Sequence, residues 1–415
     1  MKILVMHTVP YRKMEYHRAL DHDAHDITYI GAPHRMADLP PGLPATRIVI
    51  PGIESRSTEI CREVSPEDGY EWVMALSEFD LHEAGRVRAH LNVPGPRYEE
   101  LLKYKDKVLM KTLVRGAGVR APDFVDLRGM DRGRLASLRD SLAWQGRTIL
   151  KPILGASSVG VHRFESPQEA IDFLLTSPEA DTYFQDGDLE EYVEGTILHV
   201  DGVSEGGAPL LMVASRYINT PLEYVGGKPL GSMQFKLSED YRAFFTASLR
   251  AVGITDGAFH LEVIEGPRGL VFMEVANRAG GGDIIPTTEA STGLHIPSEE
   301  IKVLLRKQRR LLGIPDDGEP RSTPFLKDSG PWFGWFCIPG HQLESAHARV
   351  EFPDWMAGSS NIVKLAVTHE ERPLLKSVTH QYWEVATAGI VQGQDSREVE
   401  TLVRRICDEV RVIPV

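Results

Sequence analysis

The chain has 415 residues, 42% of them hydrophobic and 25% charged, so it is long enough for several packed cores. Its formal net charge of −13 argues against a general nucleic-acid binder and favours small-molecule chemistry. The three cysteines, Cys61, Cys337 and Cys407, are far apart and fit neither a zinc site nor a disulfide framework. The short apolar run 1–7 is neither a signal peptide nor a membrane span. We therefore expect a cytoplasmic protein without a nucleic-acid or membrane partner.

The first hundred residues alternate short apolar runs with polar stretches. Runs at 2–7, 27–30, 47–50 and 72–76 predict strands, with helices or loops between them. This alternation is typical of an α/β domain with a partly parallel sheet. No GxGxxG motif follows the first strand, so no dinucleotide site is predicted.

A helix is predicted from Asp106 to Gly116, with Asp106 as its N-cap. Lys107 lies in its first turn, where a positive charge opposes the helix dipole. That mild cost hints at another role for Lys107, but a solvated lysine is the better interpretation of this segment taken alone.

A loop of small residues, Gly155–Gly160, follows a predicted strand that carries Lys151 near its end. Small residues let the backbone approach a phosphate closely, and successive N–H groups can cradle it. The loop joins two strands, so it is neither a Walker A loop nor a Rossmann turn. An ordinary β-turn is the alternative, and the nearby Lys151 favours phosphate binding.

Two later segments are candidates for holding and covering a nucleotide. A strand, a hinge at 189–195 and another strand are expected, and the hinge backbone could pair with the edge of an adenine. The polar stretch 218–232 contains three glycines and two prolines and is a candidate lid.

The stretch 258–282 holds the strongest chemical signal. Two apolar runs flank a turn cluster at 265–269, which predicts a hairpin. Centring the turn on Pro267 places Glu262 opposite Phe272 and diagonal to Glu274. Carboxylates so close repel unless a proton or a cation lies between them, and oxygen ligands suit Mg²⁺. Two exposed glutamates on a half-solvated hairpin are the alternative, and the upstream lysine and glycine loop favour the metal site.

The last part of the chain predicts a basic-ended helix at 298–312, a linker at 315–320 and a small α+β region. Strands are expected at 332–338, 362–367 and 383–390, followed by a helix at 396–410.

Taken in order, five motifs over about residues 75–312 resemble the ATP-grasp superfamily. The best match is to its carboxylate–amine ligases, which resemble D-alanine–D-alanine ligase and bacterial L-amino-acid and dipeptide ligases. The resemblance implies an α/β and α+β fold in which two lobes clamp ATP. The expected domains are an N-terminal α/β pre-ATP-grasp domain at 1–104, a small lobe at 105–187, a large lobe with the metal site at 188–314 and a C-terminal α+β subdomain at 321–415.

The resemblance also implies roles for single residues. It assigns ATP phosphates to Lys107 and Lys151, the flexible loop over them to Gly155, Ser157, Ser158 and Val159, and the adenine hinge to Glu190, Glu191 and Val193. It assigns Mg²⁺, with Mn²⁺ as an alternative, to Glu262 and Glu274, and the acyl phosphate to Arg278 as the catalytic arginine.

The chain departs from the superfamily pattern at two positions. The usual ribose carboxylate is replaced by Ile197, and the usual metal asparagine by Ala276. Asn277 could serve as the third metal ligand only if the strand bulges. Three polar residues, His199, Asp201 and His260, are candidates for the substrate pocket, and structural polar groups are an equal alternative.

The expected activity is that of an ATP-dependent ligase, which forms an acyl phosphate from a carboxylate and lets an amine displace the phosphate. Because acyl phosphates hydrolyse in water, a closing lid is expected. The alternatives are a kinase or carboxylase-type enzyme of the same fold without an amine acceptor, and a non-catalytic nucleotide-binding protein. Expected partners are a small-molecule carboxylate and amine, either amino acids or an acyl group on a carrier protein, and a homodimer is the commonest assembly of soluble enzymes.

Overall fold

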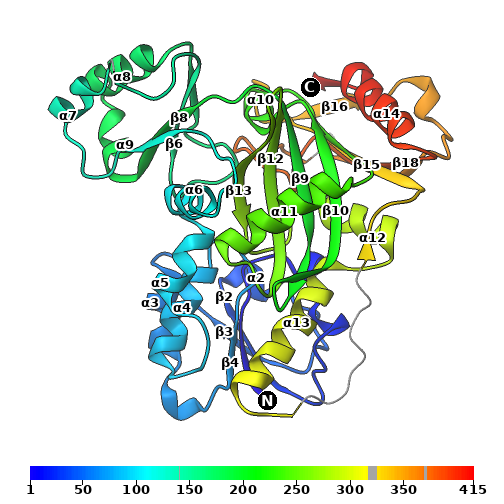
Figure 1. Cartoon of the computed structure of the whole chain (residues 1–415). Coiled ribbons are helices and arrows are strands. Elements are labelled where there is room, and N and C mark those ends of the chain that lie inside the picture. The colour runs from blue at the N-terminus through cyan, green and yellow to red at the C-terminus, as the bar shows by residue number, and fades with distance from the viewer. Residues whose placement is uncertain (140, 316–324, 369–371) are drawn as a thin grey trace.

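The computed structural model describes residues 1–139, 141–315, 325–368 and 372–415. Of the predicted linker 315–320, all but Pro315 lies outside the described residues. The N-terminal domain lies at the bottom of Figure 1, a small lobe at the upper left, and a large sheet runs between and above them. In the described part of the chain, no helix is both long and apolar enough to cross a bilayer.

The N-terminal domain is built on a parallel sheet of four strands in the order β3-β2-β1-β4. Residues of β1 alternate between two buried layers, with Ile3 and Val5 on one face and Leu4 and Met6 on the other. Burial on both faces explains why this strand is a continuous apolar run. The strands are β1 Lys2–Met6, β2 Asp26–Gly31, β3 Thr46–Val49 and β4 Trp72–Met74, and the helices are α1 Tyr11–Met14, α2 Pro33–Met36, α3 Arg56–Glu63, α4 Leu81–His90 and α5 Tyr98–Leu101.

The small lobe has an antiparallel sheet in the order β5-β8-β6-β7, covered by short helices. Because β8 belongs to this sheet, the chain leaves the small lobe at 192–195 and not at the expected boundary of 187. The strands are β5 Phe124–Asp126, β6 Thr148–Pro152, β7 His162–Phe164 and β8 Gly187–Glu191, and the helices are α7 Arg132–Ser137, α8 Pro167–Thr176 and α9 Ala180–Asp186.

The large lobe is organised by a sheet of nine described strands, in the order β13-β12-β9-β10-β11-β15-β18-β17 with β14 beside β10. Its first strands are β9 Thr196–Glu205, β10 Ala208–Ile218, β11 Leu230–Gln234, β12 Gly257–Gly266 and β13 Gly269–Ala276. The helices of this lobe are α6 Lys107–Gly116, α10 Pro221–Val225, α11 Glu239–Val252, α12 Ile284–Thr292 and α13 Ile296–Leu311.

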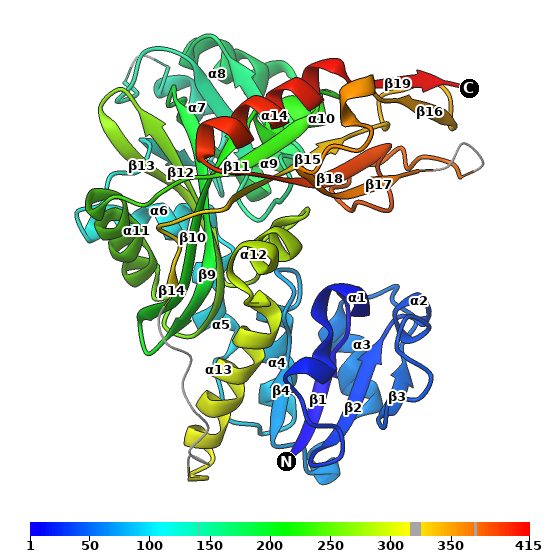
Figure 2. The ribbon, with the colours of Figure 1, turned by 90° about the vertical axis from the view of Figure 1, so that its right-hand side faces the viewer.

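Strands from the expected C-terminal subdomain continue the large sheet, because β15 pairs with β11 and β18 pairs with β15. Figure 2 shows these strands running on from the large lobe, with α14 packed over them. The C-terminal elements are β14 Phe325–Leu326, β15 Trp332–Ile338, β16 Ala348–Glu351, β17 Ile362–Val367, β18 Thr387–Gly393, α14 Ser396–Glu409 and β19 Arg411–Pro414, and β16 pairs with β19.

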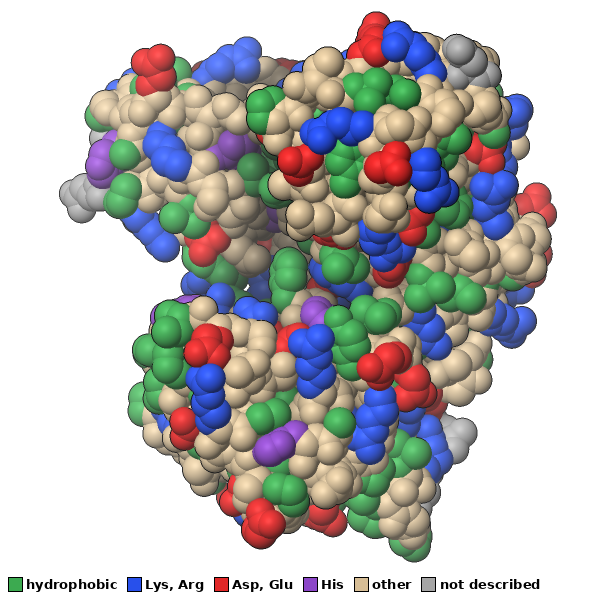
Figure 3. Space-filling model, turned by 90° about the vertical axis from the view of Figure 1, so that its left-hand side faces the viewer, with side chains coloured by type: hydrophobic (Ala, Val, Ile, Leu, Met, Phe, Trp, Pro, Cys, Tyr) green, Lys and Arg blue, Asp and Glu red, His purple; other side chains and the backbone are tan. Residues whose placement is uncertain are grey.

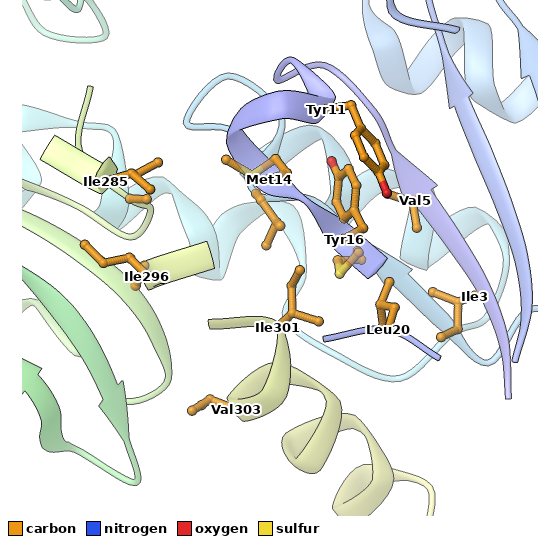
Figure 4. Close-up of a cluster of buried hydrophobic side chains, with 14 of the residues drawn as sticks. Ile3, Val5, Tyr11, Met14, Tyr16, Leu20, Ile285, Ile296, Ile301 and Val303 are labelled. Atoms are coloured by element: carbon orange, nitrogen blue, oxygen red, sulfur yellow. The ribbon is translucent and has the colours of Figure 1, made fainter. Parts of the chain in front are cut away.

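One apolar core joins the N-terminal domain to the large lobe. Figure 4 shows Ile301 of α13 beside Tyr16 and Leu20 from the first twenty residues, and Ile296 belongs to the same core. Outside this core, Arg18 pairs with Glu289 at 2.6 Å. The N-terminal domain is therefore held firmly against the helices that follow the hairpin.

The candidate lid at 218–232 is ordered. Residues 221–225 form α10, capped by Thr220, whose hydroxyl accepts from the Glu223 backbone N–H at 3.1 Å. Residues 230–234 form β11 inside the large sheet. The prediction of a long loop was wrong because the glycines and prolines here bound short elements, and residues of α10 together with Leu230 of β11 line the cavity described below.

Candidate active site

A cavity of about 370 Å³ lies where the small lobe, the large sheet and the N-terminal domain meet. Figure 3 shows the surface hollowed between the upper and lower parts of the molecule. The volume is in the range of small-molecule sites. Thirteen of the sixteen predicted site residues line it: Lys107, Lys151, Gly155, Ser157, Ser158, Val159, Glu190, Glu191, Val193, His260, Glu262, Glu274 and Arg278. The other three, His199, Asp201 and Asn277, do not.

The hairpin β12–β13 brings two carboxylates together. Alternation along β12 turns Leu261 and Val263 into the core, so Glu262 faces the cavity. In the observed register, Glu262 lies directly opposite Glu274, and Val263 opposite Phe272. The predicted register placed Phe272 opposite Glu262. It was wrong because a β-bulge between Glu262 and Val263 adds one residue to the return strand, which moves the two glutamates closer than a plain hairpin would.

Glu262 is held in a buried polar network. Its Oε1 accepts from the Tyr217 hydroxyl at 3.1 Å and lies 3.4 Å from His260 Nε2. Burial opposes ionisation, but the hydrogen bond and charge of His260 lower the pKa of Glu262. Although burial opposes the charged imidazole, Asp201 and Glu262 raise the pKa of His260 to about 10. Both groups are therefore charged at neutral pH.

The candidate substrate residues His199 and Asp201 form the layer behind His260. Asp201 accepts from His260 Nδ1 at 2.8 Å and from His199 Nδ1 at 2.6 Å. His199 Nε2 lies 2.6 Å from Ser232 Oγ. Of the three, only His260 lines the cavity, so His199 and Asp201 act through it.

Lys107 reaches the cavity from the first turn of α6. The buried Met110 and Val114 fix this helix to the large lobe, which aims its N-terminal end at the hairpin. Lys107 Nζ lies 3.2 Å from Glu274 Oε2 and donates to the Gly155 carbonyl at 2.6 Å. Lys107 thus connects Glu274, a predicted Mg²⁺ ligand, with the small-residue loop.

The small-residue loop has an unusual backbone. Ser157 and Ser158 have φ angles of 57° and 56°, and Gly160 has a φ of 72°. Consecutive non-glycine residues in the left-handed region are strained, and such strain concentrates at ligand sites. This backbone supports the predicted role of the loop as a phosphate cradle.

Lys151 and Glu190 form part of a buried charge network. On β6, Leu150 packs into the small-lobe core while Ile149 and Lys151 face the cavity. Lys151 Nζ lies 2.6 Å from Glu190 Oε1, and Lys111 pairs with Glu190 Oε2 at 2.6 Å and also with Asp188. Burial opposes both charges, but the opposite partners keep Lys151 protonated by raising its pKa and lower the pKa of Glu190.

The adenine hinge stays a prediction, since it concerns the backbone at 189–195. The Glu190 side chain lies between the two lysines and also lines the cavity. Residues 192–195 link the two lobes, and Tyr192, Val193 and Gly195 line the cavity. Nearby lining side chains are apolar, and the sequence analysis had not selected these: Ile149, Ile264 and Met273. Ile197 also lines the cavity, at the position where the superfamily has its ribose carboxylate.

Arg278 meets a residue that the sequence analysis did not assign. Its Nε and Nη2 donate to Glu78 Oε2 at 3.1 and 2.6 Å, and Lys105 Nζ donates to Glu78 Oε1 at 2.9 Å. Burial disfavours the carboxylate, but Arg278 and Lys105 lower the pKa of Glu78 to about 2. The one sequence signal for Glu78 is its place just after β4, at the carboxyl edge of the first sheet, because such edges carry ligand sites in α/β folds.

Asn277 does not join the two glutamates. Its Nδ2 donates to the Ala258 carbonyl at 2.7 Å, near the buried Glu300 of α13. The metal role for Asn277 is therefore not supported, because the bulge lies at Glu262 and leaves Asn277 outside the cavity lining.

The donor set fits a hard divalent cation. Glu262 and Glu274 present carboxylate oxygens from directly paired strands, and each now lies beside a cationic side chain, His260 or Lys107. Ionised carboxylates in one cavity are the ligands that Mg²⁺ prefers.

No family model matches the sequence. The L-arginine-specific L-amino acid ligase of Bacillus subtilis is 24% identical over 285 residues, which cover 65% of this chain and 68% of that protein. The crystal structure of L-amino acid ligase from Bacillus licheniformis superposes with a TM-score of 0.71 at 17% identity, covering 100% of this chain and 98% of that chain. The biotin carboxylase domain of the Hydrogenobacter thermophilus 2-oxoglutarate carboxylase, solved with ADP, magnesium and bicarbonate, superposes with a TM-score of 0.66 at 14% identity, covering 99% and 90%.

The solved structures share the fold of this chain over nearly its whole length, and the Bacillus subtilis ligase is similar in sequence over about two thirds of it. The chain has the ATP-grasp fold, and part of its sequence is similar to that of an L-amino acid ligase.

Proposed function

We propose that the protein joins the carboxylate of one amino acid to the amine of a second and converts ATP to ADP and phosphate. The observation that carries this proposal is the half-buried pair of Arg278 and Glu78, which lines the same cavity as Glu262, Glu274 and Lys107. The curated relative, an L-amino acid ligase, supports the substrate class.

The pair Arg278 and Glu78 suits a zwitterion. An amino acid offers a carboxylate and an ammonium, so it can replace the ion pair by placing its carboxylate on Arg278 and its ammonium on Glu78. The guanidinium fork recognises carboxylates and phosphates alike, so Arg278 can stay bound as the carboxylate becomes an acyl phosphate.

The phosphate side is served by the lysines and the strained loop. Lys107, Lys151 and the N–H groups near Ser157 and Ser158 would bind the ATP phosphates, because phosphoryl transfer depends mainly on positioning and charge neutralisation. Glu262 and Glu274 would hold Mg²⁺, which supplies charge neutralisation on phosphate oxygens when bound. His260 and Tyr217 would keep Glu262 ionised and oriented.

The attacking amine must be a free base, and it displaces phosphate from the acyl carbon to leave an amide. The C–O bond to the phosphate breaks, so one carboxylate oxygen leaves with the phosphate. A homodimer and a carrier-bound acyl donor stay predictions.

Transfer of ¹⁸O tests the reaction class. An amino acid labelled with ¹⁸O in its carboxylate is expected to give ¹⁸O-labelled phosphate together with unlabelled ADP, and only when an amine acceptor is present. A stable phosphorylated product without an amine would indicate the kinase alternative, and product formed only with bicarbonate would indicate the carboxylase alternative.

A further inference from the structure

One end of the cavity is lined by large apolar and aromatic side chains. Tyr217, Leu230, Ile284 and Trp335 belong to a single hydrophobic cluster, and each also lines the cavity. The rings of Tyr217 and Trp335 meet edge to face, with centroids 6.3 Å apart. This group, which we name the aromatic wall, takes no part in holding phosphates or Mg²⁺ in the proposed function, apart from the Tyr217 hydroxyl.

The aromatic wall lies beside the backbone that follows Arg278. A Cβ on Gly282 would lie 3.4 Å from Trp335 Cη2, and Gly282 has a φ of +58°. Gly281 has open space where its side chain would be. Both glycines line the cavity, so space is left between Arg278 and the indole.

His380 also lines this end of the cavity, and its ring is neutral. It stacks on Tyr224, with centroids 4.5 Å apart and planes 24° from parallel. Burial, together with the charge of Lys13, lowers the pKa of His380 to about 4.

The two lysines around this end already have partners. Lys13 Nζ donates to the Gly282 carbonyl at 3.4 Å, and Lys364 Nζ pairs with Asp283 Oδ1 at 3.0 Å. A charged ligand side chain would lose its water here and compete with these contacts, whereas an apolar one would only gain from burial.

The segment that follows His380 is fixed by side chains from other parts of the chain. The Arg12 guanidinium lies 3.2 Å from the centroid of the Trp383 ring, and Lys364 Nζ lies 3.7 Å from that of Tyr382. The N-terminal domain and the large sheet therefore hold this segment from two sides, which gives the cavity end a defined shape.

We propose that the aromatic wall binds the side chain of the amino acid whose carboxylate is activated, and that it selects a large apolar side chain, aromatic above all. This inference rests on the proposed function, since it places the carboxylate on Arg278. The ring edges and the indole face would pack against an aromatic ligand in the offset or edge-to-face geometry that such rings prefer.

The test compares acyl donors in the full-length enzyme with ATP and Mg²⁺. L-phenylalanine, L-leucine, L-alanine, L-arginine and L-glutamate are each supplied with an equimolar mixture of amino acids as acceptors, and tandem mass spectrometry identifies the N-terminal residue of each dipeptide. We expect L-phenylalanine to exceed L-alanine, L-arginine and L-glutamate as the N-terminal residue by at least tenfold. A charged or small residue as the best donor would overturn the inference.

Variants locate the selectivity. Trp335→Ala is expected to reduce the preference for L-phenylalanine over L-alanine at least tenfold, and Trp335→Phe to retain it. If Trp335→Ala does not fold, Leu230→Ala enlarges the same end and is expected to favour L-tryptophan over L-phenylalanine. Ile149→Ala is the matched control, since Ile149 lines the cavity near the hinge and is not part of the aromatic wall. It is expected to raise the KM for ATP without changing the ranking of the acyl donors.

Different results would contradict the aromatic wall and the proposed ligase activity. Dipeptides with an unchanged donor ranking in both wall variants would contradict the aromatic wall and leave the ligase standing. ATP binding without any dipeptide from any donor would contradict the proposed function itself.

Discussion

Arg278 donates two hydrogen bonds to a single carboxylate oxygen of Glu78, which lies 200 residues earlier in the chain. Glu78 follows the last strand of the N-terminal sheet, and Arg278 follows the hairpin of the large lobe. The N-terminal domain therefore contributes directly to the cavity. Because one apolar core also joins that domain to α13, the pair has a stable frame on both sides.

Glu78→Gln tests the ammonium site. The variant keeps the shape and loses the charge, so we expect the KM for the acyl-donor amino acid to rise about tenfold or more, which corresponds to about 1.4 kcal/mol. The KM for ATP should change much less. Steady-state kinetics with both substrates varied measures the two constants. The exposed Glu63 of the same domain provides the control Glu63→Gln. An equal rise in both KM values would contradict the assignment.

Glu274→Gln tests the metal site. Losing one anionic ligand should lower the maximal rate of phosphate release by about a hundredfold or more and raise the Mg²⁺ concentration needed for half-maximal rate. A Mg²⁺ titration measures both effects. Glu265→Gln is the matched control, since Glu265 lies on the same hairpin and pairs with Arg216 at 2.8 Å. An unchanged Mg²⁺ dependence in Glu274→Gln would remove this residue from the site.

Lys111→Met tests the buried charge network. The substitution leaves Asp188 and Glu190 with one buried cation fewer, and breaking such a pair costs about 3–5 kcal/mol of unfolding free energy. Urea denaturation measures the loss. Lys236→Met, at an exposed lysine, should cost far less. A loss below about 1 kcal/mol in Lys111→Met would show that the network contributes little to stability.

Glu300→Gln tests a stability effect that depends on pH. Glu300 Oε1 accepts from the Ala258 N–H at 3.1 Å, while Oε2 is buried with no hydrogen-bond partner among the described residues. Burial raises the pKa of Glu300 from 4.5 to about 8. Between these two values the folded protein keeps a proton that the unfolded chain has released, so stability falls as the pH rises through that window.

The Gln variant should remove this loss. At pH 5 we expect Glu300→Gln and the parent to unfold at similar temperatures. At pH 8 we expect the variant to be more stable than the parent. The upper limit of this gain in unfolding free energy is about 1.4 kcal/mol for each pH unit between the two pKa values. Thermal unfolding at both pH values checks this. A variant that is less stable than the parent at pH 8 would contradict the neutral state of Glu300.

Elements that depend on local sequence patterns were predicted correctly, whereas features that depend on contacts between distant segments were not. The helix at Lys107, the strand at Lys151 and the hairpin with Glu262 and Glu274 depend on local patterns, and the structure contains all three. The bulge that pairs the two glutamates directly depends on how β12 also meets β9, which one strand's sequence does not encode. The long loop expected at 218–232 was wrong for a similar reason, because pairing with β10 and β15 turns part of it into β11.

Two side-chain roles required the tertiary structure. Glu190 was expected in the adenine hinge, and its side chain also lies between Lys111 of α6 and Lys151 of β6, which no local pattern predicts. Glu78 was not selected because its partners, Lys105 and Arg278, become neighbours only when the domains pack. Electrostatic partners distant in sequence leave no periodic signal in the chain.

A screen of amino-acid pairs with ATP and Mg²⁺, in which phosphate release and dipeptide formation are measured together, tests the proposed ligase reaction. We expect phosphate and dipeptide to appear in a 1:1 ratio, only when both amino acids are present, and we expect Arg278→Ala to abolish both while ATP still binds. Phosphate release that continues without any second amino acid, or dipeptide formation that survives in Arg278→Ala, would contradict it.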